Sequence, residues 1–244
     1  MRVLPMLALG TLSWACGGAA PLMHPAHGMA EGDVTMGAGF SGVMAVEPQA
    51  IEPADVAARS LEEGAMSPGL APWVGGRVGL GSAYDAGLTY TGRSARLDIR
   101  RAIEFGAPAL SIGLGASGLL PKRHDELGLR VGGFGADVPL LVGYQSAADI
   151  YSAWIGARGG FELLTGQRDL EEDPNDPAAP AAEDLSGWHV QAGGLVGLRV
   201  GFRHVFAVLE LGAAMHWVEG QVGDVETDVQ QFSLSPAGAL VGRF

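Results

Sequence analysis

The sequence predicts an all-β fold, an up-and-down antiparallel β-barrel of about ten strands, with eight strands as the alternative. Apolar residues alternate with small or polar ones at a period of two over most of the chain, which is the period of a strand rather than a helix. Glycine supplies 39 of the 244 residues, roughly twice its ordinary share. Short and long connections largely alternate between these segments, as expected for a series of hairpins.

Composition excludes several other classes of protein. With 48% apolar residues and only 17% charged ones, most of the chain cannot be disordered. Cys16 is the one cysteine, which excludes a disulfide scaffold. The net charge of −12 makes nucleic acid an unsuitable partner, because phosphate contacts need a basic surface. The sequence contains no CxxC, HExxH or P-loop motif, so we predict no cofactor and no metal centre.

The first segment has the pattern of an export signal. Arg2 precedes an apolar run over residues 3–12, and small residues follow, so we predict a signal peptide over residues 1–15. Cys16 follows directly, which resembles the lipobox of bacterial lipoproteins and implies that Cys16 is lipidated. Ordinary cleavage after Ala15 or Ala20 is the alternative, and both routes export the chain.

Residues 16–32 are expected to form a lipid-anchor and linker segment that precedes a barrel domain over residues 33–244. The linker contains His24 and His27, but it has no carboxylate or further cysteine at ligand spacing. We therefore expect a solvated linker rather than a metal site.

The alternation is clearest between Val205 and Trp217, where Leu209 lies on one face and Glu210 on the other. A period of two places successive side chains on opposite faces of a strand. Ten segments follow this pattern: Asp33–Val46, Trp73–Gly81, Asp85–Thr91, Ser94–Ile103, Ala109–Leu119, Asp137–Gln145, Ile150–Leu163, Trp188–Phe202, Val205–Val218 and Gln230–Phe244.

The polar face of these segments consists mostly of Gly, Ser and Thr with isolated charges, whereas surplus acid lies in the connections, with seven carboxylates between Asp169 and Asp184. Strands that are apolar outside and polar inside are typical of transmembrane barrels.

A short helix is expected over residues 53–65, in the first outer loop. Interfacial girdles are expected from aromatic residues near strand ends: Trp73, Tyr90, Tyr144, Tyr151, Trp188 and Trp217.

The chain ends in an alternating strand closed by Phe244, which resembles the C-terminal assembly signal of bacterial outer-membrane β-barrels. The resemblance covers residues 33–244 as architecture. It implies a porin-like protein in the outer membrane of a Gram-negative cell envelope, with membrane lipids and the barrel assembly machinery as partners. The acidic outer loops are candidates for binding divalent cations.

The polar face would bring a network of charges into the lumen, where unpaired charge is costly. Arg96, Asp98 and Arg100 share one strand face and are expected to pair with Arg158 and Glu162, or with Arg199 and Glu210. We predict a plugged lumen with a structural role, and a narrow solute pathway is the alternative. The predicted network comprises Arg77, Asp85, Arg96, Asp98, Arg100, Arg158, Glu162, Arg199 and Glu210.

The protein is not expected to be an enzyme. An outer-membrane hydrolase with a rim site is an alternative, with His189 near Asp184 and Ser186, or with His216 near Glu219, as general base. Another alternative is a soluble, lipocalin-like periplasmic lipoprotein, whose apolar face would line a cavity.

Overall fold

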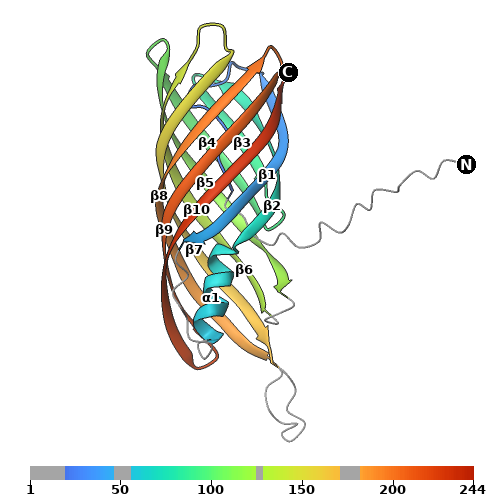
Figure 1. Cartoon of the computed structure of the whole chain (residues 1–244), viewed down its shortest axis with the longest axis vertical. Coiled ribbons are helices and arrows are strands. Elements are labelled where there is room, and N and C mark those ends of the chain that lie inside the picture. The colour runs from blue at the N-terminus through green and yellow to red at the C-terminus, as the bar shows by residue number, and fades with distance from the viewer. Residues whose placement is uncertain (1–19, 47–55, 125–128, 171–181) are drawn as a thin grey trace, which may run out of the picture.

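A computed structural model describes residues 20–46, 56–124, 129–170 and 182–244. Ten antiparallel strands close into one barrel in which each strand pairs with its neighbours in sequence and β1 pairs with β10 (Figure 1). The predicted fold class and strand number are thus confirmed. The strands are β1 (Val34–Val46), β2 (Gly69–Gly81), β3 (Tyr84–Tyr90), β4 (Ser94–Glu104), β5 (Pro108–His124), β6 (Leu129–Gln145), β7 (Tyr151–Asp169), β8 (Ala182–Phe202), β9 (Val205–Val222) and β10 (Val225–Arg243).

The closing seam lies between the first and last strands. Thr35 is in register with Arg243, and the Phe244 amide donates to the carbonyl oxygen of Val34 at 2.9 Å. One end of the barrel carries the C-terminus and four short turns, at residues 82–83, 105–107, 146–150 and 203–204. We call this the short-turn end.

Strands β5 to β10 are longer than predicted, with 17 to 21 residues each, whereas β1 to β4 have 7 to 13. Their additional length projects beyond the short strands at the end opposite the short turns (Figure 1). We call this part, residues 119–124, 129–133, 164–169, 182–187 and 218–229, the extension. Because of the extension, two connections that were expected to be long are short. Only residues 223–224 separate β9 from β10, and only residues 125–128 separate β5 from β6.

Outside the extension, the outer surface of the barrel is apolar. Leu97 and Leu209 are each 62% exposed, and Ile155 is 65% exposed. Their sequence neighbours Arg96, Asp98 and Glu210 are buried in the lumen. The predicted orientation, apolar outside and polar inside, therefore holds here. A lipocalin-like barrel requires the reverse orientation and does not fit this surface.

Aromatic residues lie at both edges of this apolar surface. Tyr144 and Tyr151 stack at the short-turn end with ring centroids 6.0 Å apart, and Trp188 and Trp217 lie where the extension begins. Contrary to the prediction, Trp73 is not part of this aromatic girdle. It is only 5% exposed and packs inside the barrel, because its position in β2 has the inward parity of the alternation.

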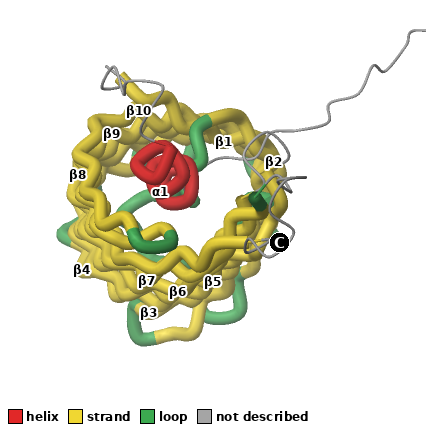
Figure 2. Tube along the Cα trace, turned by 90° about the horizontal axis from the view of Figure 1, so that it is seen from below, coloured by secondary structure: helices red, strands yellow, loops and turns green. Residues whose placement is uncertain are grey.

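The predicted helix is present as α1 (Val56–Met66), but it lies inside the barrel and not in an outer loop (Figure 2). Leu61, fully buried, packs with Ala57 and Ala65 against apolar side chains on the inner face of the extension. Arg93, in the β3–β4 turn, donates to the carbonyl oxygens of Glu63 and Gly64 near the end of α1. Such a cation also interacts favourably with the negative end of the helix dipole.

The segment from Ala20 to Ala30 contradicts the prediction of a solvated linker. Leu22, Met23 and Ala26 are buried in the lumen, and His24 and His27 are 5% and 7% exposed. We call residues 20–30 the lumenal segment. Its prolines, histidines and glycine are typical of a linker in sequence, but the charged barrel wall satisfies its backbone groups and allows it to be buried.

Candidate functional site

Seven charged side chains form a continuous chain of ion pairs along the inner wall of the barrel. Asp85 binds both Arg100 (Nε to Oδ1, 2.7 Å) and Arg77 (Nη2 to Oδ1, 2.6 Å). Asp98 joins Arg77 at 2.7 Å to Arg96 at 2.6 Å. Four arginines therefore alternate with three aspartates in the order Arg100, Asp85, Arg77, Asp98, Arg96, Asp137 and Arg158.

Asp137 is the member that the sequence analysis missed. Its carboxylate binds Arg96 Nε at 2.7 Å and Arg158 Nη2 at 3.1 Å. The predicted strand began at Asp137, which concealed its place in the middle of β6. The outward alternation of Val138, Leu140 and Val142 in the same strand was the signal that places Asp137 on the opposite, inner face.

The predicted pairing partners are therefore partly wrong. Arg96, Asp98 and Arg100 do lie together, but they pair along the wall with β2, β3 and β6 rather than with Glu162, Arg199 or Glu210. The register explains this, because Asp85 lies opposite Arg100 and Asp98 lies opposite Gly87 on adjacent strands.

Lumenal glycines provide the space for these side chains. A Cβ atom on Gly115 would lie 2.5 Å from Arg96 Nη2, and one on Gly197 would lie 2.0 Å from Cε2 of the inward Trp154. Neither distance is compatible with ordinary packing. At these two positions, glycine therefore makes room for large lumenal side chains.

The ends of the ion-pair chain bind the lumenal segment. Arg158 Nη1 donates to the Ala20 carbonyl oxygen at 2.7 Å, and Arg100 donates to the carbonyl oxygens of Pro25 and His27. From β9, the Glu210 carboxylate accepts the amides of Leu22 at 2.8 Å and Met23 at 3.0 Å. Backbone donors and acceptors of the segment are therefore bound from different sides of the lumen.

A second polar cluster connects four strands next to this segment. His189 Nδ1 lies 2.9 Å from Glu162 Oε2, and its Nε2 lies 2.9 Å from His216 Nδ1. His216 Nε2 lies 2.7 Å from the Ser233 hydroxyl. All four side chains point into the lumen, and Ser233 is 1% exposed.

The proposed hydrolase rim site is not assembled. Asp184, Ser186 and Glu219 are exposed on the outer face of the extension, whereas His189 and His216 are buried on the inner face. Each predicted acid or serine thus lies on the opposite face of the barrel wall from the histidine that it was expected to assist.

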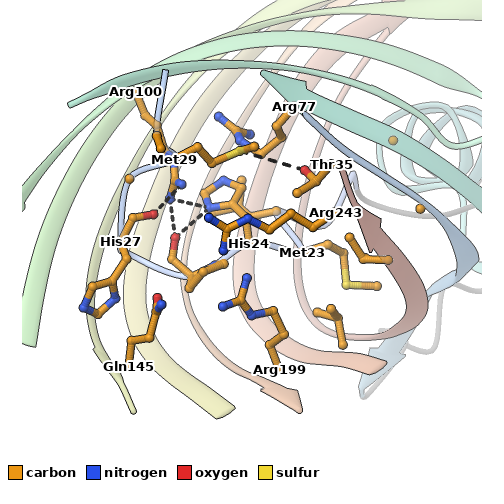
Figure 3. Close-up of a pocket in the computed structure, with 18 of the residues that line it drawn as sticks. Met23, His24, His27, Met29, Thr35, Arg77, Arg100, Gln145, Arg199 and Arg243 are labelled. Atoms are coloured by element: carbon orange, nitrogen blue, oxygen red, sulfur yellow. Dashed lines mark hydrogen bonds between the residues drawn. The ribbon is translucent and has the colours of Figure 1, made fainter. Parts of the chain in front are cut away.

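The remaining predicted lumenal arginine, Arg199, belongs to a separate group at the short-turn end. It donates to Ser152 at 3.1 Å and to Asp149. Arg243 binds the same Asp149 carboxylate at 2.9 Å and also binds Asp33. These residues lie beside a cavity of about 820 Å³ whose lining includes Arg199, Arg243 and part of the lumenal segment (Figure 3).

The other end of the lumen differs in character, because α1 fills it with an apolar face. Burial and the neighbouring Glu63 raise the pKa of the Glu62 carboxyl in α1.

Among the described residues, no cluster of three or more His, Cys, Asp or Glu side chains could hold a metal ion. Within the same residues, no helix is long and apolar enough to cross a membrane.

Comparison with known proteins gives a likeness of fold only. No protein-family model and no curated protein matches the chain. Neisserial surface protein A aligns with 87% of this chain and 96% of its own, at 12% identity and a TM-score of 0.35. The CymD monoaromatic hydrocarbon channel aligns with 88% of this chain and 89% of its own, at 11% identity and a TM-score of 0.26. At these values the likeness carries no information about function.

Proposed function

We propose that this protein is an integral outer-membrane β-barrel whose lumen is closed by its own residues, with a structural role rather than that of an open pore. The observation that carries the proposal is the binding of the lumenal segment. Arg100 and Arg158 hold its carbonyl groups, and Glu210 holds its amides. The segment would therefore act as an internal plug.

The outer surface supports insertion into a membrane. On β9, the apolar outer face runs from Val205 to Trp217, which corresponds to about 40 Å of strand. At a tilt of about 45° this length spans about 28 Å, close to the apolar thickness of a bilayer. The short-turn end would face the periplasm, because turns on that side of outer-membrane barrels are short.

Two experiments test this proposal. A membrane barrel should resist carbonate extraction and should migrate differently on gels before and after boiling, whereas full solubility without detergent would contradict it. In a planar bilayer, the closed lumen should show no steady conductance. Ion-selective wild-type currents that change with Asp98→Ala would contradict closure and favour a solute pathway.

Export and anchoring are proposed on the sequence pattern. Residues 1–19, including the signal peptide and Cys16, lie outside the described residues. Arg158 binds the Ala20 carbonyl oxygen in the lumen, so the four-residue step from Cys16 to Ala20 provides at most about 14 Å of reach for a lipid anchor. If Cys16 is acylated, Cys16→Ser should produce an unlipidated protein. An unchanged mass, apart from the side-chain difference, would show ordinary cleavage.

Three further interactions remain proposals. Phe244 is 76% exposed at the closing seam, where the barrel assembly machinery could read it as a C-terminal signal. Outer-membrane lipids would surround the apolar surface. The acidic connection that would bind divalent cations lies mostly outside the described residues, at 171–181.

A further inference from the structure

The cavity at the short-turn end combines positive charge with an apolar wall. Its volume of about 820 Å³ is within the range of pockets that hold small organic ligands. Trp73, Val208 and Val241 contribute apolar side chains to the lining. Arg199 and Arg243 contribute guanidinium groups (Figure 3). The cavity thus offers both a site for an anionic group and a surface for an apolar tail.

The chain itself shows which group these arginines bind. The Asp149 carboxylate bridges them, because it accepts from Arg199 Nη2 with one oxygen and from Arg243 Nη1, at 2.9 Å, with the other. Bridging by a carboxylate is the recognition for which guanidinium geometry is suited. Asp149 reaches them from a turn where its φ is +50°, a conformation that aspartate tolerates better than most residues.

Arg199 retains a further donor for a ligand. Its Nε binds Ser152 and its Nη2 binds Asp149, whereas Nη1 forms no hydrogen bond with any described residue. The Arg199 side chain is 10% exposed, and it lines the cavity. Little of its guanidinium group therefore remains in contact with bulk water, which strengthens an ion pair formed there.

We infer that this cavity binds a small amphipathic carboxylate. The ligand carboxylate accepts hydrogen bonds from Arg199, with Arg243 nearby, and competes with Asp149 for the two guanidinium groups. Its apolar tail lies along Trp73, Val208 and Val241. This inference goes beyond the closed barrel proposed above, because the site is reached from the short-turn end and needs no open lumen.

The test is equilibrium dialysis of labelled hexanoate against the full-length folded protein in neutral detergent, with detergent alone as the blank. Hexylammonium, which has the same tail and the opposite charge, should bind no better than to the blank. Arg199→Gln should weaken hexanoate binding about tenfold or more, because it removes a charge-assisted contact. Asp149→Asn should strengthen binding severalfold, because it removes the internal competitor while retaining a side chain that tolerates positive φ.

Arg203→Gln is the matched control. Arg203 is exposed in the turn between β8 and β9 at the same end, and its guanidinium lies over the Phe202 ring rather than in the cavity. It should leave hexanoate binding unchanged. Equal binding of hexanoate and hexylammonium, or equal effects of the two arginine variants, would overturn the inference. If Arg199→Gln loses the gel shift of a folded barrel, Asp149→Asn decides, and unchanged or weaker binding there overturns the inference.

Discussion

The part of the barrel outside the extension and the extension itself have opposite polarity. In the first, the ion-pair chain lies inside and side chains such as Leu209 cover the outside. In the extension, Leu185, Val218 and Val222 face inwards against α1, whereas Glu219 and Gln221 face outwards. Both parts are built from the same strands with the same period of two. Under the proposed membrane insertion, the surroundings of the wall, lipid for the first part and water for the extension, decide which face is apolar.

The two parts also close the lumen by different means. Ion pairs and hydrogen bonds to the lumenal segment fill the middle, and they are strong only if every charge is paired. Packing of α1 fills the extension and depends on buried apolar area. A substitution in the ion-pair network should therefore lower the stability of the whole barrel, whereas a substitution in the packing of α1 should have a local effect.

The largest effect is expected from Asp98→Ala. This change removes one carboxylate from both Arg77 and Arg96, so the free energy of unfolding should fall by about 3–5 kcal/mol. Urea titrations of the barrel in lipid vesicles measure it. Asp228→Ala, on the exposed outer face of the extension, should change stability by less than about 0.5 kcal/mol. Equal effects would mean that the lumenal charges are not coupled.

Leu209→Arg should have the next largest effect. Leu209 is 62% exposed on the apolar outer surface, and an arginine near the middle of the membrane costs about 2–4 kcal/mol. The same titration measures this loss. Gln221→Arg, on the same face of β9 but in the extension, should be nearly neutral. Ala214→Arg, on the inner face, is limited by volume and pairing instead. Equal tolerance at residues 209 and 214 would show that the faces are misassigned.

A smaller, local effect is expected from Arg93→Gln. The change weakens the hydrogen bonds to the carbonyl oxygens of Glu63 and Gly64 near the end of α1, with a local cost of about 1–2 kcal/mol. Hydrogen exchange should become about tenfold faster in α1 and stay unchanged in the strands. Arg59→Gln, which changes an arginine with a 56% exposed side chain, is the control. Equal acceleration in α1 and the strands would show that the helix is not an independent unit.

The smallest effect is expected from Ser233→Ala. It removes the 2.7 Å hydrogen bond with His216, at a cost of about 1 kcal/mol in the free energy of unfolding. Ser235→Ala, at the next inward position of β10, changes a hydroxyl that forms no hydrogen bond with the histidines among the described residues, and it should cost less. A loss as large as that of Asp98→Ala would show that the histidine cluster belongs to the same cooperative network.

The sequence predicted the fold and much of the lumen. Alternation identified the ten strands, and it placed Arg77, Asp85 and Arg100 on the inner face because strand parity is a local property. The alternation failed to predict the extension, where the polarity of the two faces inverts. A rule that places apolar side chains on the outer face assigns Leu185 and Val218 to the wrong side. The predicted strands therefore ended near the start of the extension or before it.

Two features depended on tertiary structure alone. Residues 20–30 have the composition of a linker, and they are buried because Glu210, Arg100 and Arg158, far away in sequence, converge on their backbone. Barrel closure likewise sets the pairing of Asp137 with Arg96 and Arg158. The sequence by itself determined which side of each strand a residue occupies, since that follows from backbone geometry. Only the closed barrel decided which charges meet across strands and what fills the lumen, because those contacts depend on register and on the space that the wall encloses.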